Sequence, residues 1–144
     1  MEKVFILAMK ITNKIDEANF LIKKFSWIDF FIVSLDENKM VIFGTMDSSF
    51  GKQVEIIMEN VCYIDMPTSW KMNIKENNPI KFISQNNMTE AFVNKFLDNG
   101  KGDLFMFSAE SFMGETFYHI AASSFELRIL SYNKYFPWNM DIKN

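Results

Sequence analysis

The chain contains one cysteine and one histidine, Cys62 and His119, the residue types that most often serve as nucleophile and general base in enzymes. A cysteine nucleophile needs a neighbouring cation or a helix N-terminus to stabilise the thiolate. Cys62 instead belongs to an alternating pattern from Val54 to Met66, on the side that carries most of the apolar residues. We therefore expect Cys62 to be a buried, inert thiol near the end of a strand.

His119 belongs to TFYHIAASSFELRIL, residues 116–130, whose composition predicts a strand. Alternation places it on the side of Phe117 and Ala121, which indicates a half-buried, hydrogen-bonded histidine rather than a catalytic base. A pair with Cys62 would require two strands that are distant in the sequence to meet. The alternative that stays open is a small enzyme or a small-ligand-binding domain with a pocket near His119.

Metal and phosphate sites have little support in the sequence. One histidine and one cysteine cannot form the usual zinc ligand sets, and the acidic residues lack the spacing of a calcium loop. The segment NGKGD, residues 99–103, lacks the preceding strand and following helix of a phosphate-binding loop. We expect a helix-to-strand turn there, and no metal or cofactor.

The charges argue against a nucleic-acid partner. Acidic residues outnumber basic ones by 18 to 15, and Arg128 is the only arginine, the residue best suited to bidentate phosphate and guanine contacts. The apolar segment VFILAM is shorter than the roughly 20 residues of a membrane span, so we expect no membrane partner. A single cysteine is typical of a reducing compartment, and we expect a cytoplasmic protein.

The first half of the chain predicts a helix followed by a hairpin. Apolar residues recur at spacings of three and four, which predicts a helix over about residues 12–25 and leaves Val4–Met9 as either its extension or a short strand. The stretches IDFFIVSL and KMVIFGTM then predict two strands joined by a polar turn at residues 36–38. Both faces of these strands are largely apolar, which is typical of strands with something packed on each side.

The alternating pattern of residues 54–66 follows, and its length predicts a bulge or bend near Glu59 and Asn60. Further along we expect a short strand at 80–84 and a helix that is capped by Asn87 and ends at Asn99 and Gly100. Strands at 103–111 and 116–130 close the chain. The expected fold is α+β, one domain over residues 1–144, with an antiparallel sheet of five or six strands and two amphipathic helices packed on it.

Residues 8–71 resemble small bacterial immunity proteins, the antidotes of secreted or contact-delivered toxins. The resemblance lies in the order of a helix ending in KKFSW, then IDFFIVSLDENKMVI, then VEIIMENVCYIDMPTSW. Trp27 and Ile28 stand where some such sequences have a histidine before the aspartate near Asp29. The resemblance implies a non-enzymatic protein that binds and neutralises one cognate toxin.

Candidate contact residues for such a partner come from side-chain type. Tyr135 and Trp138 lie in YNKYFPW, where Pro137 prevents regular structure, and tyrosine and tryptophan commonly anchor protein interfaces. The alternative is that this segment folds back over a sheet edge. We also expect Glu55 and Glu59 to be exposed acids that offer charge to a basic toxin.

Overall fold

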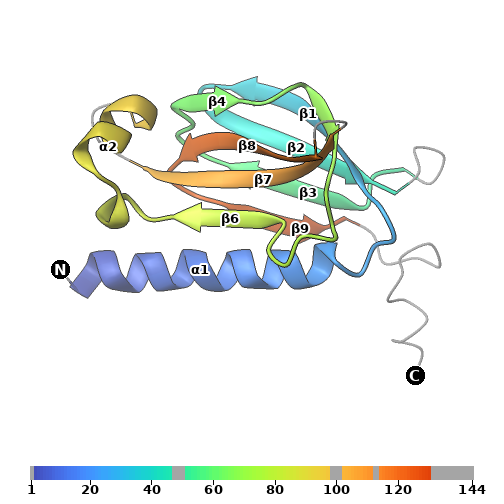
Figure 1. Cartoon of the computed structure of the whole chain (residues 1–144), viewed down its shortest axis with the longest axis horizontal. Helices are drawn as coiled ribbons and strands as arrows, with labels where there is room; N and C mark the ends of the chain where they lie inside the picture. The colour runs from blue at the N-terminus through green and yellow to red at the C-terminus, as the bar shows by residue number, and fades with distance from the viewer. Residues whose placement is uncertain (1, 47–50, 98–101, 112–113, 131–144) are drawn as a thin grey trace.

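The structure, a computed structural model, describes residues 2–46, 51–97, 102–111 and 114–130. Two antiparallel sheets pack face to face, and α1 lies along β6 and β9 (Figure 1). The helices are α1 (Glu2–Ile22) and α2 (Glu90–Phe96), with a short 3-10 helix, η2 (Gln85–Asn87). The strands are β1 (Asp29–Asp36), β2 (Lys39–Thr45), β3 (Val54–Met58), β4 (Tyr63–Asp65), β5 (Ser69–Lys71), β6 (Ile80–Ile83), β7 (Asp103–Ser111), β8 (Gly114–Ala122) and β9 (Glu126–Ile129).

The α+β prediction with antiparallel pairing is confirmed. The strands form two sheets where the sequence predicted one: a five-stranded sheet in the order β5-β1-β2-β3-β9 and a four-stranded sheet in the order β4-β8-β7-β6. Their facing sides share one core, which includes Phe30, Ile42 and Ile56 from the first sheet and Phe105 and Ile120 from the second.

Helix α1 begins at Glu2, so Val4–Met9 belongs to the helix and the predicted start at residue 12 is about ten residues late. It buries Ile15, Ala18 and Ile22, the stripe that the three-and-four spacing predicts, against the common core. Among the described residues, no helix combines the length and the apolar character that crossing a membrane requires.

The predicted hairpin of β1 and β2 is confirmed. Asp36 pairs with Lys39, and the two residues between them, Glu37 and Asn38, have φ values of 49° and 66°. Positive φ at both central positions is the geometry of a two-residue type I′ turn, whose twist matches that of the strands. The inner face of the hairpin lies in the core, but no described element packs on its outer face, unlike the two-sided packing that we expected.

The predicted strand at 54–66 is kinked and serves both sheets. Asn60 has a φ of 53°, which confirms the bend predicted near Glu59 and Asn60, and the chain passes there from β3 in one sheet to β4 in the other. The predicted strand at 116–130 breaks in the same way into β8 and β9. The two corners are hydrogen-bonded, since the amide of Ser123 donates to the Glu59 carbonyl at 2.9 Å and Asn60 Nδ2 donates to Ser123 Oγ at 2.8 Å.

Helix α2 covers part of the outer face of the four-stranded sheet. Phe92, Val93 and Leu97 pack in a second apolar cluster with Leu104 and Ala121. Its N-cap is Thr89, whose hydroxyl accepts the amide hydrogen of Phe92 at 3.2 Å, so the predicted cap at Asn87 is wrong. The helix ends at Phe96, and the predicted stop at Asn99 and Gly100 lies outside the described residues.

Candidate functional site

The outer face of the five-stranded sheet carries two rows of cross-strand neighbours. One row runs from Phe31 to Phe43, Glu55 and Arg128, on β1, β2, β3 and β9. The next row runs from Ser34 to Val41, Ile57 and Glu126 on the same strands. Because paired residues in an antiparallel sheet project to the same side, these eight side chains share one face.

The centre of this face is apolar and partly exposed. Phe31, Val41, Phe43 and Ile57 belong to neither core cluster, and each keeps an intermediate exposure to solvent. The rings of Phe31 and Phe43 meet edge to face, with centroids 6.1 Å apart. We call these four residues the apolar patch.

Charged side chains border the apolar patch. Arg128 lies 3.9 Å from Glu55 and 4.0 Å from Glu126, and Lys52 Nζ lies 4.6 Å from the ring centroid of Phe43. The Glu55 side chain is only 18% exposed and is paired, so the expectation of a freely exposed acid at this position is wrong. Glu55 lies directly opposite Arg128 in the pairing of β3 and β9, so the arginine covers and pairs with its carboxylate.

A hollow of about 450 Å³ lies at the hairpin end of the same face. Its lining includes Val41 of the apolar patch and the charged residues Asp36, Glu37, Lys39 and Glu59. Three acids against one lysine give these four residues a formal charge of −2. Glu59 is exposed there, as predicted, and its backbone carbonyl is fixed by Ser123.

His119 lies on the outer face of the four-stranded sheet, between Asp65 on β4 and Met106 on β7. Burial lowers the pKa of its imidazole below the usual value, and Lys95 of α2 acts in the same direction, whereas Asp65 opposes both. The half-buried position agrees with the sequence prediction. The linings of the hollow above, of the cavity between α1 and β6 and of the hollow between α1 and β9 do not contain His119.

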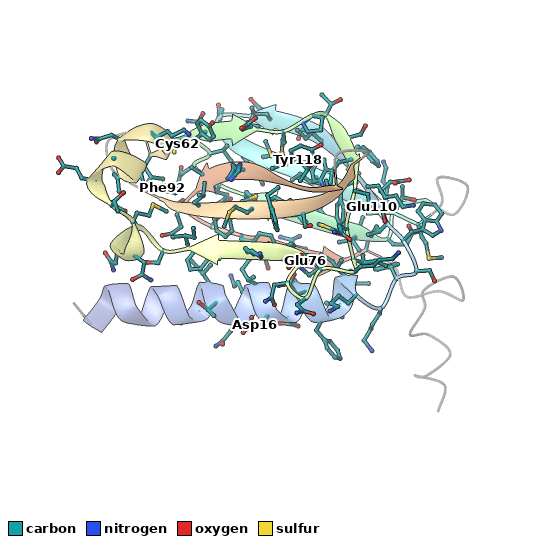
Figure 2. All side chains as sticks on the ribbon, viewed as in Figure 1. Asp16, Cys62, Glu76, Phe92, Glu110 and Tyr118 are labelled. Carbon is teal, nitrogen blue, oxygen red and sulfur yellow. The ribbon has the colours of Figure 1, made fainter. Side chains whose placement is uncertain are left out.

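Cys62 is exposed, so the predicted burial of its thiol is wrong. The left-handed residue Asn60 interrupts the alternation, and Val61 takes the core position with an exposure of 7%. Cys62, labelled in Figure 2, lies just before β4, and β4 pairs with β8, the strand that carries His119. The Cys62 amide donates to the carbonyl of Ala121, two positions after His119, at 2.9 Å.

Tyr135 and Trp138 lie outside the described residues. The sequence did not identify the apolar patch as a site, although part of its signal is present: Phe31, Val41 and Phe43 make the second face of β1 and β2 apolar. Ile57 belongs to the mixed face of β3, between Glu55 and Glu59. Trp27, which precedes β1, is a further exposed aromatic, at 37%, and Lys71 lies 5.9 Å from its ring.

Within the described ranges, no three His, Cys, Asp or Glu residues are grouped closely enough to hold a metal ion. The chain matches no protein-family model, no curated protein and no solved structure at a significant level.

Proposed function

We propose that this protein is a non-enzymatic immunity protein of the cytoplasm, which binds and neutralises a cognate bacterial toxin through the outer face of its five-stranded sheet. The observation that carries the proposal is the apolar patch. It is made of Phe31, Val41, Phe43 and Ile57, and no described element covers it.

The composition of this face suits a protein partner. Interfaces between proteins combine an apolar centre, often aromatic, with a charged rim. Here a pair of phenylalanines lies beside two aliphatic residues. Glu55, Glu126 and Arg128 border them on β3 and β9, and Lys52 lies over the ring of Phe43. A rigid antiparallel sheet also holds these side chains in place, which lowers the conformational entropy lost on binding.

The acidic hollow beside the patch indicates the charge of the partner. Asp36, Glu37 and Glu59 would attract a basic surface, which increases the rate of association and discriminates against acidic partners. A protein with a basic surface next to an apolar contact is therefore the expected ligand. The formal net charge of −3 for the whole chain has the same sign.

The resemblance to immunity proteins falls on the part of the chain that forms most of the proposed binding face. It covers residues 8–71, and this range supplies four of the five strands of the sheet, β5, β1, β2 and β3. An immunity protein needs a folded surface complementary to one toxin and no catalytic group of its own. The neutralising contact would then either cover the active site of the toxin or block a surface that the toxin needs.

Co-expression with the protein encoded directly upstream tests the proposal. We expect that protein to stop growth when it is produced alone and to be harmless in the presence of this chain. A variant with Phe43 replaced by Glu should fail to protect, whereas a variant with the same replacement at Phe20, an exposed residue of α1, should protect fully. If the upstream protein is not toxic, or if it kills despite abundant folded wild-type chain, the immunity function is wrong.

A further inference from the structure

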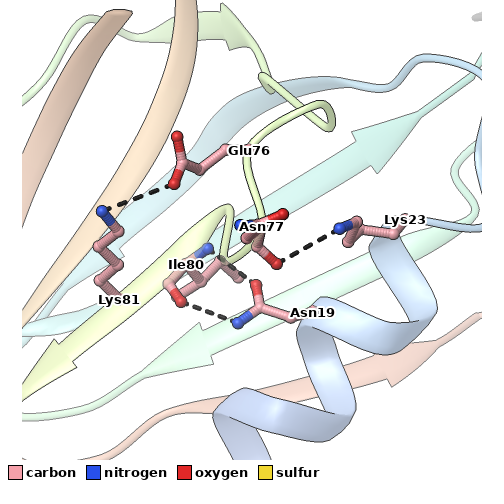
Figure 3. A network of polar contacts seen from close by, with 6 residues as sticks. All are labelled: Asn19, Lys23, Glu76, Asn77, Ile80 and Lys81. Carbon is pink, nitrogen blue, oxygen red and sulfur yellow. Dashed lines mark hydrogen bonds and ion pairs between the residues drawn. The ribbon is translucent and has the colours of Figure 1, made fainter.

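Helix α1 contacts the free edge of β6 through the side chain of Asn19 (Figure 3). The Ile80 amide donates to Asn19 Oδ1 at 2.8 Å, and Asn19 Nδ2 donates to the Ile80 carbonyl at 2.9 Å. One primary carboxamide therefore satisfies both backbone groups of an edge-strand residue. Asn19 is 5% exposed, so this pairing is shielded from water.

The backbone N–H and C=O of Phe82 are the next groups after those of Ile80 that point away from β7. Strand β6 pairs with β7 on its other side, and in an antiparallel pair alternate residues direct their N–H and C=O groups away from the partner. Since Ile80 points outward to Asn19, Phe82 also points outward, about 6.7 Å further along the strand. No hydrogen bond from the described part of the chain reaches these two groups of Phe82.

A cavity of about 340 Å³ lies beside Phe82, between α1 and β6. Thr12, Ile15 and Asp16 line it from the helix, and Phe82 and Met106 line it from the sheet. Ile15 and Asp16 lie one helical turn before Asn19 and face this part of the edge. Neither residue has a carboxamide side chain that could pair with Phe82 as Asn19 pairs with Ile80. The cavity therefore leaves open the place that Asn19 fills at Ile80.

We propose that this cavity binds a small ligand that carries a primary carboxamide, which pairs with the N–H and C=O of Phe82 as the side chain of Asn19 pairs with Ile80. The oxygen and one amide hydrogen of a primary carboxamide lie on the same side of the group, so it can accept and donate toward one strand residue. A secondary amide in the trans form cannot, because its N–H and C=O point in opposite directions. This inference does not depend on the proposed toxin-binding function.

Asp16 adds a preference for positive charge. Lys81 also lines the cavity, but its ammonium group already lies 3.7 Å from Glu76. The exposed carboxylate of Asp16 can therefore pair with an ammonium group that the ligand carries beside the carboxamide. Glycinamide is the smallest probe with both groups. Glycine N-methylamide keeps the ammonium group and the size class but has a secondary amide, which makes it the matched control.

Titration of the ¹⁵N-labelled full chain with each probe, followed by NMR, tests the inference. We expect glycinamide to shift the Phe82 amide resonance in a saturable manner and glycine N-methylamide to leave it unchanged. Thr12→Trp places a large side chain in the cavity and should abolish the shift, whereas Asn13→Trp, at the adjacent exposed position outside the lining, should preserve it.

Three results would overturn the inference. These are the lack of a saturable shift at Phe82 with wild-type protein, equal shifts from both probes, and equal loss of the response in both tryptophan variants. The comparison of probes needs only the wild-type chain, so it remains decisive if Thr12→Trp does not fold.

Discussion

Asn19 and Ile80, 61 positions apart in the chain, form two buried hydrogen bonds that fasten α1 to the edge of the four-stranded sheet. The contact protects the edge strand β6 from pairing with other chains, a role that natural sheets often assign to a covering helix. Nearby, Lys23 Nζ also donates to the carbonyl of Asn77 at 3.4 Å, and Lys81 lies 3.7 Å from Glu76 (Figure 3). Asn19 and Lys23 thus attach the end of the helix to the segment that leads into β6, and the Lys81–Glu76 pair lies within that segment.

Replacement of Asn19 by Leu should destabilise the fold strongly. The change leaves the N–H and C=O of Ile80 buried without their partners, and each such group costs about 1–3 kcal/mol. We therefore expect a loss of about 2 kcal/mol or more in the free energy of unfolding, measured by urea denaturation. Asn13→Leu, on the exposed side of the same helix, is the control and should be nearly neutral. If both variants lowered the free energy of unfolding equally, the hydrogen bonds between Asn19 and Ile80 would not contribute the stability expected of them.

The Cys62 thiol should react with a thiol reagent in the native protein. Its side chain is exposed, because the bend at Asn60 puts Val61 rather than Cys62 into the core. We expect one equivalent to react under native conditions, at a rate close to that of the urea-unfolded chain. A native rate many times slower than the unfolded rate would show that the thiol is shielded.

His119 should make the protein less stable at mildly acidic pH. Burial lowers the folded-state pKa below the unfolded value of about 6.5, so the unfolded chain takes up its proton first as the pH falls. Stability should therefore decrease as the pH falls through about 6.5 toward the lower folded pKa, where the loss becomes complete. Unfolding free energies of the wild type and of His119→Gln between pH 8 and pH 5 measure this contribution. If the difference between the two proteins did not change with pH, the imidazole would be as well solvated in the folded state as in the unfolded state.

Much of the fold can be predicted from local signals, and the failures have physical causes. The hairpin around Glu37 and Asn38 follows from turn chemistry and β-rich flanks, which are local properties. The division into two sheets depends on corners at Asn60 and Ser123, which are fixed by hydrogen bonds between segments more than 60 residues apart. No local pattern contains that information, so the alternation was extended through the bend and Cys62 was assigned to the wrong environment.

The candidate site was only partly predictable for a similar reason. Glu59 was chosen by residue type and does line the acidic hollow, but Glu55 is paired with Arg128 through a strand neighbourhood that appears only in the fold. The apolar second face of β1 and β2 was recognised as a face that something must cover. Sequence could not decide between an element of the same chain and a partner, because that depends on where α1 and α2 pack.

The affinity of the wild-type chain and of two variants for the upstream-encoded protein tests the central claim most directly. Phe43→Glu places a charge in the middle of the apolar patch, and loss of a central aromatic contact typically costs about 2 kcal/mol or more, which is about 30-fold in Kd. Phe20→Glu makes the same change on exposed α1 and should leave the Kd unchanged, with circular dichroism confirming that both variants fold. Selective weakening by Phe43→Glu is the predicted result. Equal affinities of the two variants, or no complex with the wild-type chain, would contradict the assignment of this face as the toxin-binding surface.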